Sequence, residues 1–145
     1  MTITFMGQMM RIFVDTSAWF ALNNRKDQYH KKARDFVGRL KSSPAIFLTT
    51  DYIVDETLTL LRFKVSHREA AAFLRIFSRS RQIVREQVTP DQLKRAEEIF
   101  LRCRDKFWSF TDCVSFAFME ERRLEDAFTF DSNFSQFGIR IHPAS

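Results

Sequence analysis

The sequence predicts a single α/β domain in which helices cover both faces of a parallel sheet of about five strands. Short apolar segments of strand length alternate with longer segments whose apolar residues keep helical spacing, a pattern typical of a buried parallel sheet. The chain has 145 residues, the size of one ordinary domain. It contains only three Gly and three Pro, so we expect long helices with few breaks.

The first half of the chain is expected to hold two strands and four helices. The apolar run over 11–14 ends at Asp15-Thr16-Ser17, residues that commonly begin helices. Ser66 and Glu69 have the spacing of a helix capping box. The expected elements are a strand over 11–14, helices over 18–23 and 28–41, a strand over 45–48, and helices over 51–65 and 66–77.

The second half alternates in the same way. Thr89-Pro90-Asp91 is a strong helix start, because Pro is favoured in a first turn. The expected elements are a strand over 82–88, helices over 90–103 and 109–123, and strands over 127–130 and 139–141. We expect one domain over 11–145, with residues 1–10 forming an extension or an alternative start in which Met10 is the natural first residue.

Charge and cysteine content limit the function classes. The net charge of +5 and the pI near 9.6 favour a polyanionic partner such as RNA. Cys103 and Cys113 form neither a disulfide framework nor a zinc-type pair, which favours a cytoplasmic location. No signal peptide and no membrane span is recognisable.

Four acidic residues stand where the expected strands and helices meet. Asp15 closes the first strand and Asp131 the fourth, Glu56 lies about one turn into the helix after the second strand, and Asp112 begins the helix before the fourth strand. Ligands of open parallel sheets bind beyond the carboxyl ends of the strands. We therefore expect these acids to converge, although they are far apart in the sequence.

Clustered carboxylates repel one another, and a divalent cation commonly neutralises them. Oxygen ligands favour Mg²⁺ or Mn²⁺ over zinc. One or two such ions can turn water into a nucleophile and stabilise the charge that develops in an in-line displacement. His30, His67 and His142 are scattered along the chain, and we expect them to serve packing or the surface.

Each acid also has a purely structural interpretation. Asp15 and Asp112 suit helix caps, Asp131 suits a turn before Ser132, and Glu56 suits a solvated helix face. From local pattern alone both interpretations stay open, and only the joint placement favours a metal site.

Four segments resemble the motifs of the PIN-domain nucleases, and the match runs in order from about Arg11 to Ile141. They are Val14–Trp19 (VDTSAW), Asp55–Leu61 (DETLTLL), Ser109–Phe116 (SFTDCVSF) and Ala127–Phe134 (AFTFDSNF), the last followed by Gly138. The spacing from Asn24 through His30 to Ala33 is similar to that of bacterial toxins of the VapC type.

This resemblance implies a three-layer α/β/α fold and Mg²⁺- or Mn²⁺-dependent hydrolysis of RNA. It implies that the metal is bound by Asp15, Glu56, Asp112 and Asp131. In many relatives, the residue that corresponds to Asp131 only supports the other acids. Ser17 and Thr111 would be hydroxyl helpers. For the toxins it further implies a cognate antitoxin and commonly a homodimer.

Three other functions stay open: an RNA-processing nuclease without an antitoxin, a module that binds RNA or protein without cutting, and a phosphatase with Asp15 as nucleophile. The phosphatase ranks low, because Ser17 stands where its second acid is expected. Basic residues could line an RNA groove: Arg25, Lys26, Lys31, Lys32, Arg34, Arg39, Lys41, Arg75, Arg79, Arg81 and Arg85. The helices with Leu58, Leu61, Phe73 and Phe77 are expected to keep some apolar surface for a partner.

Overall fold

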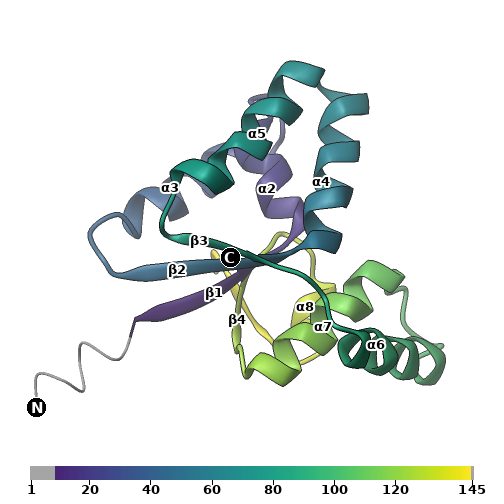
Figure 1. The fold of residues 1–145 in the computed structure, drawn as a ribbon. Helices are drawn as coiled ribbons and strands as arrows, with labels where there is room; N and C mark the ends of the chain where they lie inside the picture. Colours follow the sequence, from purple (N-terminus) through teal and green to yellow (C-terminus); the bar gives the residue numbers. More distant parts are fainter. Residues whose placement is uncertain (1–8, 145) are drawn as a thin grey trace, which may run out of the picture.

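The computed structural model describes residues 9–144, which form a five-stranded sheet and seven helices (Figure 1). The strands are β1 Met10–Val14, β2 Ala45–Thr50, β3 Ile83–Glu86, β4 Asp126–Phe128 and β5 Arg140–His142. The helices are α2 Thr16–Asn23, α3 His30–Arg39, α4 Asp51–Lys64, α5 His67–Arg79, α6 Pro90–Arg102, α7 Phe110–Arg122 and α8 Asn133–Gln136.

The predicted fold class is confirmed, because all the strands are parallel and helices cover both faces of the sheet. The strand order is β3-β2-β1-β4-β5. The chain thus adds strands outward from β1 on one side, then returns and adds β4 and β5 on the other. The direction of strand order reverses between β1 and β4, and this switch point is where ligands of open α/β sheets bind.

Helices α2 to α5 lie on one face of the sheet, and α6 to α8 lie on the other (Figure 1). Phenylalanines fill the interface between the sheet and helices α7 and α8. The ring of Phe13 on β1 packs against Phe118 of α7, with centroids 5.8 Å apart, and against Phe134 of α8, with centroids 6.1 Å apart. All three rings are fully buried. Most Phe side chains of residues 9–144 lie in the core or pack against it.

The observed elements differ from the expected ones mainly at their ends. The helix expected over 28–41 starts only at His30, because the Tyr29 N–H is bonded to the Asp27 carboxylate in a preceding turn at 2.8 Å. The strand expected over 82–88 is limited to β3, and the one over 127–130 to β4. Helix α8 was not predicted, since four residues are too few to show helical periodicity.

Residues 1–8 of the expected extension lie outside the described residues. Met10, which was assigned to that extension, instead begins β1 and pairs with Ala45. Within residues 9–144, no helix combines the length and the apolar character needed to cross a bilayer.

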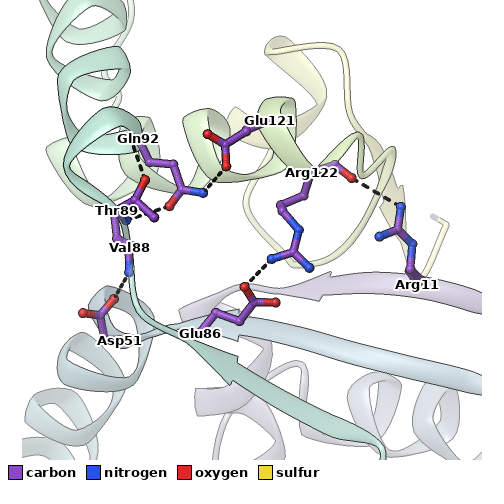
Figure 2. A network of polar contacts seen from close by, with 8 residues as sticks. All are labelled: Arg11, Asp51, Glu86, Val88, Thr89, Gln92, Glu121 and Arg122. Carbon is purple, nitrogen blue, oxygen red and sulfur yellow. Dashed lines mark hydrogen bonds and ion pairs between the residues drawn. The ribbon is translucent and has the colours of Figure 1, made fainter.

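A chain of polar contacts joins α6 and α7 to the sheet and to α4 (Figure 2). The Asp51 carboxylate at the start of α4 accepts a hydrogen bond from the Val88 N–H at 2.9 Å. Arg122 at the end of α7 pairs with Glu86 of β3, and its carbonyl accepts a hydrogen bond from Arg11 of β1. These contacts fix α7, and with it Asp112, relative to the strand ends.

A further link in this chain is the capping box at the start of α6. The Thr89 hydroxyl accepts from the Gln92 N–H at 3.1 Å, and the Gln92 side chain accepts from the Thr89 N–H at 2.9 Å. The Gln92 amide group then donates to Glu121 of α7 at 2.8 Å (Figure 2). The predicted helix start at Thr89 is confirmed, and it also holds α6 against α7.

The contact between Asp51 and Val88 can be tested by substitution. We expect Asp51→Ala to lower the free energy of unfolding by about 1–3 kcal/mol, because the buried Val88 N–H loses its acceptor. Asp51→Asn keeps an acceptor oxygen and should lose clearly less. Urea unfolding of both variants measures the difference. An equal loss in both would mean that the negative charge, and not the acceptor, is what stabilises the fold.

Candidate active site

The structure places the four predicted acids around the switch point of the sheet. Asp15 follows β1, Asp131 lies beyond the end of β4, Glu56 lies in the second turn of α4, and Asp112 lies in the first turn of α7. The Asp112 carboxylate is close enough to the other three to be affected by their charges. The expected convergence is therefore present, and all four come from different elements.

Asp15 is buried, with 4% of its surface exposed. Its Oδ2 accepts hydrogen bonds from the hydroxyls of Thr129, at 2.9 Å, and Ser17, at 3.0 Å. The Asp15 N–H donates to the Phe128 carbonyl at 3.1 Å, which ties β1 to β4. Although Asp15 stands at the N-cap position of α2, its side chain makes no capping hydrogen bond. The helix-cap interpretation is thus wrong for this side chain.

Glu56 is partly buried and accepts a hydrogen bond from the Thr16 hydroxyl at 2.6 Å. Its neighbour Asp55 is exposed. Adjacent helix residues point about 100° apart, so only one can face the site. The structure therefore directs Glu56, and not Asp55, toward the other acids.

Asp112 and Asp131 combine structural roles with their place in the cluster. Asp112 completes a capping box with Ser109, as its structural interpretation predicted, and its Oδ2 also accepts from the Asn133 amide at 3.1 Å. Asp131 accepts from the Asn133 N–H at 2.9 Å and forms the turn into α8. Asn133 thus connects the two carboxylates. Among the described residues, Oδ1 of Asp112 receives no hydrogen bond.

Burial and repulsion shift the proton affinity of two of these acids. Burial raises the pKa of Asp15 from its ordinary 3.8 to about 7; the hydrogen bond from Thr129 opposes this rise, and the Asp112 charge adds to it. Burial also raises the pKa of Asp112, and the charges of Asp131 and Glu56 contribute. The site therefore carries more negative charge than its surroundings stabilise, which makes it suited to a cation.

Of the two predicted hydroxyl helpers, Ser17 lies within the site. Its Oγ donates to Asp15, lies 3.2 Å from the Thr129 hydroxyl, and accepts from the Phe130 N–H at 2.9 Å. In the described part of the chain, the Thr111 hydroxyl makes no hydrogen bond to any of the four acids, so its role stays a prediction.

Three further polar residues take part that the sequence did not single out. Thr129 holds Asp15, Thr16 holds Glu56, and Asn133 holds Asp112 and Asp131. Thr129 and Asn133 each stand two residues from Asp131, inside the fourth motif, so a search for polar neighbours could have found them. Only the packing of α2 against α4 reveals the pairing of Thr16 with Glu56.

The ring nitrogens of His30 and His142 make contacts away from the four acids. A ring nitrogen of His30 lies 2.7 Å from the Ala21 carbonyl, and His142 lies 2.8 Å from Asp126. Burial raises the pKa of the Cys113 thiol to about 11, so it stays protonated and is a poor ligand or nucleophile. The donors at the site are carboxylate and hydroxyl oxygens.

Oxygen donors of this kind fit Mg²⁺ or Mn²⁺. Within residues 9–144, no group of three or more His, Cys, Asp or Glu side chains is arranged so that it could hold a metal ion in common. The hydrogen bonds from Thr16, Thr129 and Asn133 hold the carboxylates in their present positions. Asn133 connects the carboxylates of Asp112 and Asp131, so the donor set fits a hydrated cation held by one or two carboxylates, the binding mode typical of Mg²⁺.

The raised pKa of Asp15 predicts how stability depends on pH. Between about pH 4 and pH 7 the unfolded chain ionises Asp15 while the folded chain keeps it protonated, so the wild type loses stability as the pH rises. Asp15→Asn avoids this loss. In EDTA, the free energy of unfolding of Asp15→Asn minus that of the wild type should be near zero at about pH 4. This difference should grow to at most about 4 kcal/mol at about pH 8.

Urea unfolding across this pH range measures the difference, and Asp55→Asn is the matched control because Asp55 is exposed. The free energy of unfolding of Asp55→Asn should change with pH in the same way as that of the wild type. A stability difference between Asp15→Asn and wild type that does not change with pH would contradict the raised pKa.

Comparison with known proteins gives the same picture of the fold. The family model for the PIN domain matches residues 12–139. The chain is 37% identical over 134 residues, 91% of its length and 98% of the relative's, to the 23S rRNA-specific endonuclease VapC20 of Mycobacterium tuberculosis. It is 33% identical over 129 residues to the VapC ribonuclease of Archaeoglobus fulgidus, covering 87% of this chain and 80% of that protein.

Among solved structures, the crystal structure of Mycobacterium tuberculosis VapC20, described as a Sarcin-Ricin loop cleaving toxin, matches with a TM-score of 0.81 and 36% identity, covering 88% of this chain and 95% of that one. VapBC2 of Rickettsia felis, bound to a promoter DNA fragment, matches with a TM-score of 0.68 and 10% identity, covering 92% and 98%, which supports the fold alone. With the motifs in order, the acids at the switch point and these matches, the chain belongs to the PIN-domain family.

Proposed function

We propose that this protein is a metal-dependent endoribonuclease and the toxin of a toxin–antitoxin pair. The observation that carries the proposal is the buried Asp15 carboxylate at the switch point of the sheet, whose pKa is raised by burial and by the charge of Asp112. Such a site needs a cation, and its oxygen donors suit the metal chemistry of phosphodiester hydrolysis. The likeness to VapC20 and to the VapC ribonuclease supports RNA as the substrate.

In this proposal Asp15, Glu56, Asp112 and Asp131 hold one or two Mg²⁺ or Mn²⁺ ions. When bound, the metal supplies an activated water and stabilisation of the leaving 3′ oxygen. The protein's own contribution is positioning. Ser17 and Thr129 orient Asp15, Thr16 orients Glu56, and Asn133 orients Asp112 and Asp131.

RNA binding is supported by the surface charge. The basic residues expected from the sequence to line an RNA groove lie on α3, on α5 and in the loops beside these helices. All of them are exposed. Arg25, Lys31, Arg34 and Lys41 line a groove of about 700 Å³ between α2, α3 and α5. Phosphates of an RNA chain would be attracted to such a surface, and the affinity should then fall with salt.

An antitoxin and a second copy of this chain are the proposed protein partners. Helices α4 and α5 are the ones expected to keep apolar surface, although Leu61 and Phe73 on them are fully buried. The apolar surface on this helix pair comes instead from Leu58, Phe63 and Leu74, which line a groove of about 350 Å³ between α4 and α5. Phe63 is 81% exposed, and a partner helix would cover it. The solved structures of VapBC2 from Rickettsia felis and of FitAcB from Neisseria gonorrhoeae share this fold. A cytoplasmic location stays a prediction.

Substitution of the acids tests the catalytic role. We expect Asp15→Asn and Glu56→Gln to lower the rate of RNA cleavage by at least about 100-fold, because each removes charge that stabilises the metal and the transition state. Asp55→Asn is the matched control, since it changes the same charge on the exposed neighbour of Glu56, and it should keep the rate of wild type. Cleavage of total RNA, followed in gels with and without EDTA, measures the effect; activity that survives both EDTA and Asp15→Asn would exclude the proposed site.

Metal binding has a readout independent of cleavage. We expect Mg²⁺ to raise the unfolding temperature of the wild type, because an ion that binds only the folded state stabilises it by about 2.7 kcal/mol at 100 times its Kd. The rise should be largely absent in Asp15→Asn and unchanged in Asp55→Asn. Thermal unfolding over a Mg²⁺ series, with Ca²⁺ and NaCl as comparisons, measures it. If Mg²⁺ and NaCl had equal effects on wild type, the chain would be a PIN module without a metal site.

A further inference from the structure

A pocket lies directly beside the acidic site. It is a pocket of about 240 Å³, and Ser17, which hydrogen bonds to Asp15, forms part of its wall. Tyr29 and Phe130 form another part. The Phe130 N–H donates to the Ser17 hydroxyl at 2.9 Å. Two of the pocket's walls are thus joined by hydrogen bonds to the carboxylate at the centre of the proposed catalytic site.

The aromatic wall is a pair of rings that stack on each other and are partly exposed. The rings of Tyr29 and Phe130 are stacked, with centroids 4.5 Å apart and planes 4° from parallel, although the residues come from the start of α3 and the end of β4. Both residues are only partly buried. Nucleobases stack on aromatic side chains of this kind whatever their sequence. Among the described residues, the Tyr29 hydroxyl has no hydrogen-bond partner, so it is available to a ligand.

Helix α4 connects the pocket to the acids. Glu56, Leu60 and Lys64 are spaced four residues apart and therefore lie along one face of the helix. Leu60 and Lys64 line the pocket, whereas Glu56 faces the acids. Lys64 lies eight residues from Glu56, a rise of about 12 Å along the axis. One helix face therefore presents an acid at the proposed cleavage site and a cation at the far side of the pocket.

Lys64 also lines a second depression, of about 470 Å³, together with Arg25, Lys26 and Arg68. These four side chains are exposed, and within residues 9–144 none of them forms an ion pair. Two carboxylates lie nearby: Asp27, whose Oδ1 is bonded to the Tyr29 N–H, and Glu69. The surface thus runs from the acids, over the aromatic wall, to a group of cations, which suits a polyanion with flat bases.

We infer that this pocket is a nucleotide-binding subsite, in which Tyr29 stacks on a base next to the scissile phosphodiester and Lys64 binds the following phosphate. The inference rests on the proposed ribonuclease function. It adds the path by which the RNA chain leaves the active site. It requires the target nucleotide to be unpaired, because a base inside a duplex cannot reach an aromatic wall.

Binding of a short, mixed-sequence single-stranded RNA oligonucleotide tests the subsite. Fluorescence anisotropy is measured in the Asp15→Asn background, so that binding occurs without cleavage. We expect Tyr29→Leu to weaken binding by about 5- to 100-fold, since base stacking is lost, and Tyr29→Phe to stay within about twofold. Lys64→Ala should weaken binding and reduce the salt slope by about 0.7. Lys94→Ala, a charge-matched and exposed control on α6, should change neither.

Abasic substitution shows whether Tyr29 contacts a base. Oligonucleotides with one abasic position each are bound to the Asp15→Asn protein and to the same protein with Tyr29→Leu. At one position beside the cleavage site, removal of the base should weaken binding to the Asp15→Asn protein. At the same position it should have no further effect on binding to the protein that also carries Tyr29→Leu. Additive losses at every position would overturn the inference even if Tyr29→Leu were merely less stable, because instability does not depend on position.

The outcomes separate this inference from the proposed function. If the wild type cleaves RNA in a way that depends on Asp15 but Tyr29→Leu binds and cleaves like wild type, the subsite is wrong and the nuclease stands. If the wild type binds RNA at the pocket but never cleaves it, the nuclease is wrong and the subsite stands. If Tyr29→Leu weakens only the binding of a co-purified antitoxin, the pocket belongs to that partner and the inference fails.

Discussion

The burial of one carboxylate between two parallel strands is the constraint on which the rest of this structure depends. Asp15 lies where β1 meets β4, with only 4% of its surface exposed, and its carboxylate is held by the hydroxyls of Thr129 and Ser17. Those hydrogen bonds do not fully offset the cost of burial, as the pKa of about 7 indicates. The fold therefore places an acid where only a proton or a cation can fully neutralise it.

The surrounding structure keeps the other acids near that point. The α7 capping box fixes Asp112, and the polar chain from Asp51 through Val88 and on to Arg122 fixes α6 and α7 against the strands. Helix α4, anchored at Asp51, carries Glu56 toward the site and Lys64 away from it. The proposed catalytic site and the proposed nucleotide subsite thus share one rigid helix, so a change in the packing of α4 would affect both RNA binding and cleavage.

Local sequence was a good guide to the regular elements and to the candidate acids. Apolar strands, the capping residues Ser66 and Thr89, and Asp15 directly after the first strand are patterns that neighbouring residues determine, and these predictions are confirmed. Asp131 does not close the fourth strand as expected, because β4 ends at Phe128. Short elements were predicted poorly: β3 and β4 are shorter than expected and α8 was missed, because four residues carry no periodic signal. The structural interpretations of the acids could not be separated locally either, since the same Asp suits a cap and a ligand.

By itself, the sequence determined the fold class, the family and the set of candidate acids, because strand period, helix period and motif order can be read from neighbouring residues. The tertiary structure alone decided which side chains support those acids, because Thr16 meets Glu56 across 40 positions and Thr129 meets Asp15 across 114. It likewise decided that Asp15 does not cap its helix, and that Tyr29 and Phe130 stack beside it. Contacts between distant segments depend on how the layers pack, and no local pattern records that packing.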